Sequence, residues 1–201
     1  MSTCDGQWEY GGQMTDFVAE RWSPALGAEV HGLDLDAALR GSDSQIDEVV
    51  DSLYAALIEH QVLFLRDQPL SPEMHVELGR RLGELAPRHH SYTTLHGNDD
   101  VAVLTWEPGD RPDASEWHTD MTFRPKPPFA SILKAIELPP VGGDTLWASM
   151  YSVYDSLDAG FRSDLEGMEI CHDPGQFRNG AYERGGNQGI TDMLAEAGSA
   201  V

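Results

Sequence analysis

Three short apolar runs between residues 121 and 147 are separated by segments rich in proline and glycine, and this spacing constrains the fold more than any other feature. The runs cover residues 121–123, 130–136 and 145–147. Proline and glycine punctuation at these intervals predicts short strands joined by turns, as in a β-sandwich or barrel. Gly142 and Gly143 predict a tight turn in which backbone segments approach closely.

Further strands are predicted in the preceding part of the chain. Residues 27–35 alternate apolar and polar side chains between glycines, which is the period of a half-buried strand. The apolar run 62–65 is too brief for a helix and predicts a buried strand at the centre of the core. Residues 101–106 predict another strand within a loop-rich stretch.

Two helices are predicted between these strands. The first begins after Ser42 or Ser44 as the capping residue, and the second runs from the Ser71-Pro72 pair to about Leu82 before Gly83. The apolar face of the first helix consists of Ile46, Val49, Val50, Leu53, Leu57 and Ile58.

The ends of the chain show less pattern. Residues 1–25 are predicted to form a loose leader, and residues 26–201 are predicted to form the N-terminal and central part of a single domain of α+β class. A helical pattern occupies residues 150–168, and the glycines beyond His172 indicate a long loop.

The charge balance argues against nucleic acids and anionic membranes as partners. The net charge is −21 and the isoelectric point is about 4.4, whereas nucleic acids and anionic lipids require clustered Lys and Arg. Cys4 and Cys171 have no cysteine nearby, so no disulfide framework is predicted. Neither a basic leader nor a long apolar run is present, which predicts a cytoplasmic protein. A monomer and a homo-oligomer both stay open at the level of sequence.

The sharpest local motif is Trp117-His118-Thr119-Asp120. In an extended segment the side chains of residues i and i+2 point to one face, so His118 and Asp120 can offer two ligands to one metal ion. An imidazole and a carboxylate are two thirds of the facial triad that binds non-haem Fe(II). By itself, a histidine followed two positions later by an aspartate is common in strands that bind no metal.

The wider context is more specific than the motif. Residues 26–35, 60–68, 82–85, 117–123 and 142–147, in this order, resemble the taurine dioxygenase (TauD/TfdA) family of Fe(II)/2-oxoglutarate-dependent dioxygenases. The resemblance covers about residues 26–173 and implies a double-stranded β-helix, a cupin-like jelly roll with flanking helices.

The resemblance also implies roles for individual residues. His118 and Asp120 are the expected iron ligands, and Thr145 is expected to hydrogen-bond the cosubstrate 2-oxoglutarate. The implied reaction consumes molecular oxygen, converts 2-oxoglutarate to succinate and carbon dioxide, and hydroxylates a small organic anion. An alkyl sulfonate or alkyl sulfate would then release sulfite or sulfate, which places the protein in sulfur metabolism. The expected substrate-binding residues are His89, Tyr92, Met121 and Phe177.

Two departures from the family pattern limit these expectations. Ala114 stands where taurine-specific members have asparagine, which argues against taurine itself. The third iron ligand, a histidine, and the arginine that binds 2-oxoglutarate are expected beyond Val201. The sequence is therefore predicted to be truncated, and the 201 residues alone are predicted to be inactive.

Two other readings remain open at the level of sequence. One is a non-catalytic β-sandwich binding module or an inactive truncated remnant. The other is a zinc hydrolase built around His89, His90, His96 and His118, although no established zinc spacing is present.

Overall fold

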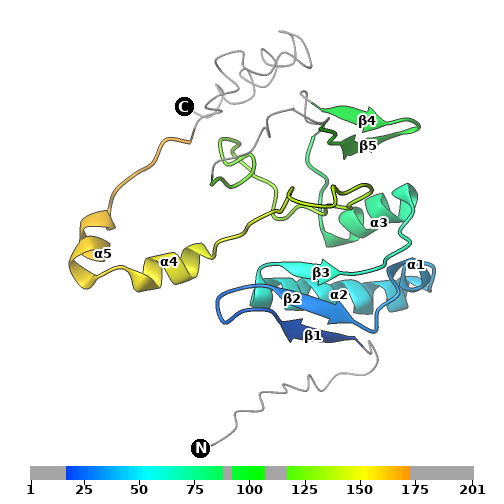
Figure 1. Cartoon of the computed structure of the whole chain (residues 1–201), viewed down its shortest axis with the longest axis horizontal. Coiled ribbons are helices and arrows are strands. Elements are labelled where there is room, and N and C mark those ends of the chain that lie inside the picture. The colour runs from blue at the N-terminus through cyan, green and yellow to red at the C-terminus, as the bar shows by residue number, and fades with distance from the viewer. Residues whose placement is uncertain (1–16, 88–91, 107–116, 173–201) are drawn as a thin grey trace, which may run out of the picture. The chain divides into compact units, whose positions relative to one another are not determined.

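The computed structural model describes residues 17–87, 92–106 and 117–172. The chain divides after Pro69 into two compact units, whose elements are labelled in Figure 1. Within the described residues, a three-stranded sheet and a two-stranded sheet are accompanied by five helices. This composition confirms the predicted α+β class. The predicted division into a leader (1–25) and the N-terminal and central part of one domain (26–201) stays a prediction.

The first unit is a small sheet with one long helix. Its strands are β1 (Val18–Arg21), β2 (Ala28–His31) and β3 (Leu63–Leu65), and its helices are α1 (Leu35–Ala38) and α2 (Asp43–His60). The sheet order is β1-β2-β3, with β1 antiparallel and β3 parallel to β2. The parallel pairing is possible because α2 carries the chain back along the sheet between the two strands.

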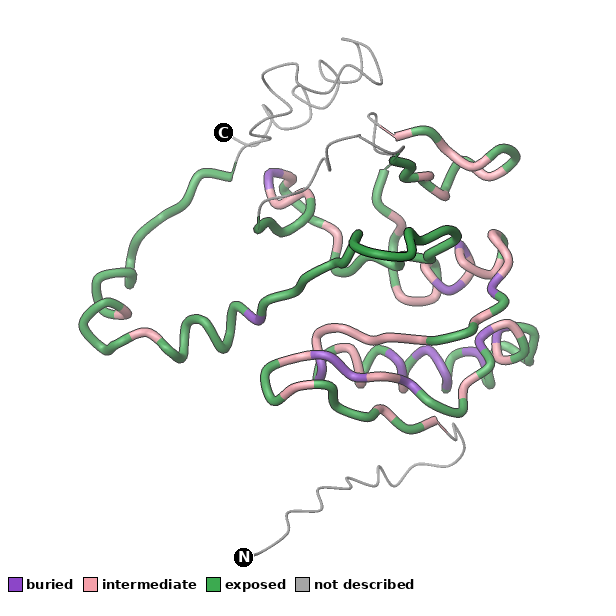
Figure 2. The backbone as a smooth tube through the Cα atoms, viewed as in Figure 1, coloured by how far each residue is buried: buried purple, intermediate pink, exposed green. Residues whose placement is uncertain are grey.

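The core of this unit lies between β2 and α2. Ala28 and Val30 alternate with the more exposed Glu29 and His31, so one face of β2 is buried. The buried residues of α2 follow its apolar face, and Figure 2 shows them as a purple stripe along the helix. They are Ile46, Val49, Val50, Leu53 and His60.

The other face of the sheet carries an aromatic pair. The rings of Trp22 and Phe64 stack with centroids 4.3 Å apart, and the Arg66 guanidinium lies 5.2 Å from the Trp22 ring centroid. Glu29 accepts a hydrogen bond from the Trp22 indole nitrogen at 3.2 Å. The run that contains Phe64 therefore contributes side chains to both faces of the sheet.

Several sequence predictions for this unit are confirmed, with four differences. The strand predicted at residues 27–35 is shorter than expected, since β2 ends at His31 and Leu35 begins α1, a helix that was not predicted. Ser42 forms a capping box with Gln45 at the start of α2, as predicted, but Ile58 is exposed. The strand β3 is half-buried rather than buried, because it pairs with β2 on one side only and lies at the edge of the sheet. Residues 18–21 form β1, although they fall within the predicted loose leader.

The second unit contains α3 (Pro72–Leu82), β4 (Thr93–Leu95), β5 (Asn98–Val103), α4 (Met150–Ser156) and α5 (Ala159–Leu165). The helix α3 has the predicted bounds, since Ser71 accepts a hydrogen bond from the Met74 amide and Gly83 follows the last turn. The strands β4 and β5 form an antiparallel hairpin, so the strand predicted at 101–106 begins and ends earlier than expected.

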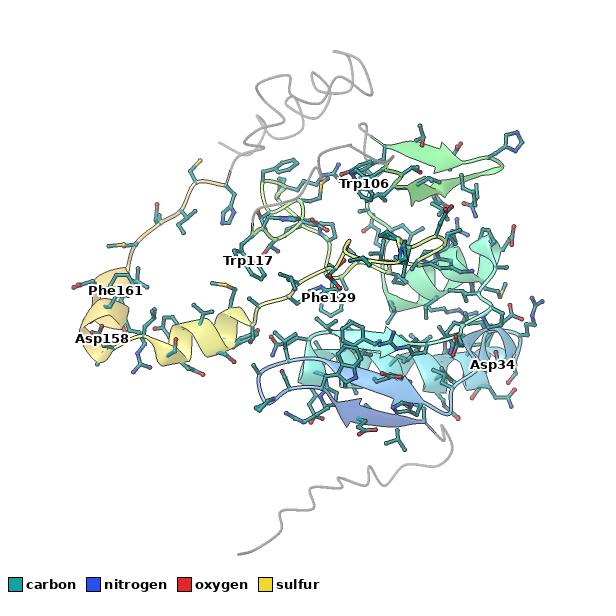
Figure 3. The ribbon with its side chains drawn as sticks, in the orientation of Figure 1. Asp34, Trp106, Trp117, Phe129, Asp158 and Phe161 are labelled. Carbon is teal, nitrogen blue, oxygen red and sulfur yellow. The ribbon has the colours of Figure 1, made fainter. Side chains whose placement is uncertain are left out.

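The helical pattern at residues 150–168 is divided into α4 and α5. Leu157 and Asp158 adopt extended backbone conformations between them, with ψ values of 146° and 156°. Asp158, labelled in Figure 3, accepts a hydrogen bond from the Phe161 amide at 2.9 Å and so begins a new helix. The interruption follows from this local cap, which competes with continuation of the first helix.

The strands predicted at residues 121–123, 130–136 and 145–147 are wrong for the described structure. Residues 120–123 form a turn, and the other two runs belong to no helix or strand and have no hydrogen-bonded ladder. Leu133 and Ile136 are 70% and 84% exposed, so these runs lack a covering layer within the described residues. A strand requires a partner backbone as well as a suitable sequence, and no partner pairs with these runs here. The jelly roll is accordingly not formed by the part of the chain that the structure describes.

Candidate metal centre

The backbone that carries His118 and Asp120 is an irregular segment that leads into a turn. Residues 117–119 belong to no helix or strand, and the turn begins at Asp120. Met121 has a φ of 56°, and the Arg124 amide donates to the Met121 carbonyl oxygen at 3.0 Å, which closes the turn. A left-handed residue other than glycine is uncommon and indicates a locally constrained backbone.

The two predicted ligands contact one another. His118 Nε2 lies 3.2 Å from Asp120 Oδ1, and the two side chains are 52% and 60% exposed. This contact agrees with the expectation that the His118 and Asp120 side chains lie on one side of the backbone. The segment that carries them is, however, not a strand. Trp117, labelled in Figure 3, directly precedes the pair and is itself largely exposed.

This donor pair fits a metal ion in chemistry and in spacing. Imidazole nitrogen and carboxylate oxygen are both ligands for first-row divalent metals. Bonds of about 2.0 to 2.2 Å, as in zinc sites, place two donors that meet at a right angle about 3 Å apart. Among the described residues, however, no three His, Cys, Asp or Glu side chains cluster together, so the structure supplies two donors and no third.

Two hydrogen bonds from distant parts of the chain reach this turn. Ser131 Oγ lies 3.4 Å from Asp120 Oδ2 and donates to it. His172 Nδ1 lies 2.9 Å from Thr122 Oγ1, across 50 positions of sequence. The sequence analysis assigned no role to Ser131 or to His172. No local motif marks a serine 11 positions after the aspartate, so only the tertiary contact reveals it.

The remaining predicted site residues are distributed more widely. Met121 is half-buried within the turn, and Thr145 is exposed and lies outside any helix or strand. Tyr92 is half-buried and immediately precedes β4. His89 and Phe177 lie outside the described residues, so their substrate-binding roles stay predictions. Gly142 and Gly143 have φ values of 82° and 74°, in the region that favours glycine. The predicted tight turn with close backbone approach is not formed there, because the two residues belong to no turn and the described atoms close to Gly143 belong to the Pro139 side chain.

The candidate zinc ligands do not form a described cluster. His96 is exposed in the turn between β4 and β5, and His118 contacts Asp120. His89 and His90 lie outside the described residues. In the residues that the structure describes, no helix combines the length and apolar content that a membrane span requires.

Comparison with known proteins identifies the family. A family model described as taurine catabolism dioxygenase TauD, TfdA family, matches residues 19–195. The alkylsulfatase of Acinetobacter baylyi is 32% identical over 147 residues, which cover 73% of this chain and 44% of that protein. The alpha-ketoglutarate-dependent sulfate ester dioxygenase of Pseudomonas putida is 34% identical over 152 residues, covering 73% and 46%.

A solved structure is similar as well. A taurine dioxygenase from Burkholderia xenovorans matches with a TM-score of 0.62 and 33% identity, covering 75% of this chain and 51% of that one. The chain spans about half the length of the curated relatives it matches. Because the family model matches most of the chain, over a range that includes all the blocks identified in the sequence, the protein belongs to the TauD/TfdA family of Fe(II)/2-oxoglutarate-dependent dioxygenases.

Proposed function

We propose that the protein is an Fe(II)/2-oxoglutarate-dependent dioxygenase that hydroxylates a small organic anion, either an alkyl sulfate or an alkyl sulfonate. The observation that carries the proposal is the 3.2 Å contact between His118 Nε2 and Asp120 Oδ1 in a segment matched by the family model. Two metal donors meet there at the start of a locally constrained turn, and they are the part of a facial triad that this segment can supply.

The proposed roles follow from the chemistry of each side chain. His118 and Asp120 would hold Fe(II), and the Thr145 hydroxyl would donate to 2-oxoglutarate. When bound, the iron would supply oxygen activation and hydroxylation of a substrate C–H bond. A carbon hydroxylated beside a sulfonate sulfur would lose sulfite by cleavage of the C–S bond, and one hydroxylated beside a sulfate ester oxygen would lose sulfate by cleavage of the C–O bond. In both cases the hydroxyl group loses its proton and the carbon becomes a carbonyl. The chain's own task is to orient the cosubstrate and the substrate at the metal.

An anionic substrate needs local donors in this protein. The net charge of −21 repels anions over long range, so affinity for a sulfate or sulfonate must come from hydrogen-bond donors at the site. His89 and Tyr92 are the proposed donors, with Met121 and Phe177 as apolar contacts to the substrate chain. The relatives named for alkyl sulfates and sulfate esters support this substrate class, and Ala114 in place of asparagine argues against taurine.

A second candidate function has one observation in its favour. The described residues offer two metal donors rather than three, which suits a binding module without catalytic activity. A cation held by two exposed side chains would exchange readily, because stable sites engage three or four protein ligands. The cytoplasmic location and homo-oligomeric assembly stay predictions under either proposal.

The test compares three variants of the complete gene product. Consumption of 2-oxoglutarate is measured with Fe(II) and oxygen across alkyl sulfates, alkyl sulfonates and aryloxy acids. His118→Ala and Asp120→Ala are expected to abolish substrate-dependent consumption, while the exposed His96→Ala is expected to retain it. Full coupled turnover in either of the first two variants would refute the proposed iron site. If the protein showed zinc-dependent hydrolysis and His96→Ala abolished it, the result would instead support the zinc hydrolase hypothesis.

A further inference from the structure

We propose that Ser131 is a positioning residue that orients the Asp120 carboxylate for metal binding; the inference rests on the proposed function. Ser131 Oγ donates to Asp120 Oδ2 at 3.4 Å, while His118 Nε2 lies 3.2 Å from the other carboxylate oxygen, Oδ1. Each oxygen of this carboxylate therefore has its own partner. The carboxylate plane is thereby defined by one ligand side chain and by one residue that is not a ligand.

Orientation matters here because the Asp120 side chain is 60% exposed. An exposed aspartate samples several rotamers, and binding a metal in one of them costs side-chain entropy. A second hydrogen bond reduces this cost by restricting the carboxylate before the metal arrives. Partners of this kind commonly orient metal ligands in proteins.

Ser131 is itself anchored, although it lies outside any helix or strand. The next residue, Ile132, accepts a hydrogen bond on its carbonyl oxygen from His75 Nε2 at 3.1 Å. The Lys134 ammonium donates to the carbonyl oxygen of Leu70, just before α3. Residues 131–134 are thus attached to the beginning of α3 at two points, and α3 is a capped helix of 11 residues. The serine hydroxyl is presented from a fixed segment rather than from a freely moving one.

The expected size of the effect is modest. Residues that orient metal ligands typically contribute 10- to 100-fold to metal affinity. The contact of 3.4 Å is long for a hydrogen bond between two oxygens, and the site is exposed to water. The loss of the Ser131 hydroxyl should therefore weaken metal binding by about 10-fold, at the lower end of that range.

The experiment uses a pair of variants of matched shape in the complete gene product. Ser131→Thr keeps a hydroxyl on the β-carbon, whereas Ser131→Val places a methyl group there, so both variants share the same steric cost. Mn(II) affinity is measured by the electron paramagnetic resonance signal of the unbound ion, without turnover. We expect the Thr variant to bind within about twofold of the parent and the Val variant to bind about 10-fold more weakly. Equal affinities of the Thr and Val variants would overturn the positioning role.

Two controls separate this inference from the proposed function. Asp120→Ala should lose Mn(II) binding by far more than the Val variant does, and unchanged binding in Asp120→Ala would refute the metal site itself. Ser156→Ala removes an exposed hydroxyl on α4 that donates to the Val153 carbonyl oxygen, and it should leave Mn(II) affinity unchanged. A loss in Asp120→Ala together with equal binding by the Thr and Val variants would leave the metal site standing and refute the role of Ser131.

Discussion

At the scale of single residues, His60 couples the stability of the first unit to pH. It is the last residue of α2 and is only 7% exposed, and burial lowers its pKa from the ordinary value of 6.5. Glu59 opposes this shift and Arg21 adds to it, both more weakly than burial. Because its pKa is lower in the folded chain, His60 binds a proton more tightly in the unfolded chain. The contribution of His60 to the free energy of unfolding is therefore fully present above about pH 6.5 and is lost as the pH falls below that value.

The comparison of His60→Leu with the parent chain measures this effect. We expect the urea midpoint of the parent to fall between pH 7.5 and pH 5.5, and the fall to be smaller in His60→Leu, which has no proton to bind. His96→Leu removes an exposed histidine and should keep the parental pH dependence. An equal fall in His60→Leu and the parent would show that His60 does not carry the coupling.

At the scale of elements, α2 stabilises the first unit through one face only. Leu53 is 5% exposed and lies among the buried residues of the helix, whereas Ile58 is 56% exposed. Leu53→Ala should lower the free energy of unfolding by about 2 to 5 kcal/mol, because it leaves a cavity in the core. Ile58→Ala should change it by less than about 0.5 kcal/mol, as a surface substitution does. Urea denaturation followed by the helical circular dichroism signal measures both, and similar losses in the two variants would contradict the described packing.

At the scale of the whole molecule, the two units differ in how well their apolar side chains are covered. The helices α4 and α5 have seven residues each and bury none, and isolated helices of this length are marginal in water. Residues 129–147 expose several large apolar side chains, including Leu133, Ile136 and Leu138. We expect the 201-residue chain to bind an apolar dye, because large exposed apolar surfaces are rare in stable monomers. We also expect it to consume no 2-oxoglutarate, because the described residues supply two metal donors and no third.

Hydrogen exchange and dye fluorescence test this prediction on the 201-residue chain. Backbone amides of residues 130–147 and 150–165 should exchange faster than those of α2, whose hydrogen bonds are covered by a packed face. Replacing Leu133, Ile136 and Leu138 together by serine should reduce dye fluorescence. A sharp cooperative melt without dye binding, or turnover of 2-oxoglutarate by these residues alone, would contradict the prediction.

The sequence by itself determined the features that depend on neighbours within one or two turns. The bounds of α3 follow from Ser71, Pro72 and Gly83, and the start of α2 follows from Ser42 and Gln45. Caps act over three or four residues, so their signals are complete within a short window. The family and the His118–Asp120 pair were also predictable, because several blocks keep their order and the two donors are two residues apart.

Only the tertiary structure decided which apolar runs became strands. Residues 63–65 of the run 62–65 form β3 because β2 lies beside them in register, whereas the similar run 130–136 has no ladder partner in the described residues. The role of Ser131 has the same origin, since its partner Asp120 is 11 positions away in a turn that no pattern predicts. Strand pairing and contacts of this kind depend on residues that are distant in sequence, so a local pattern can propose them but cannot select among them.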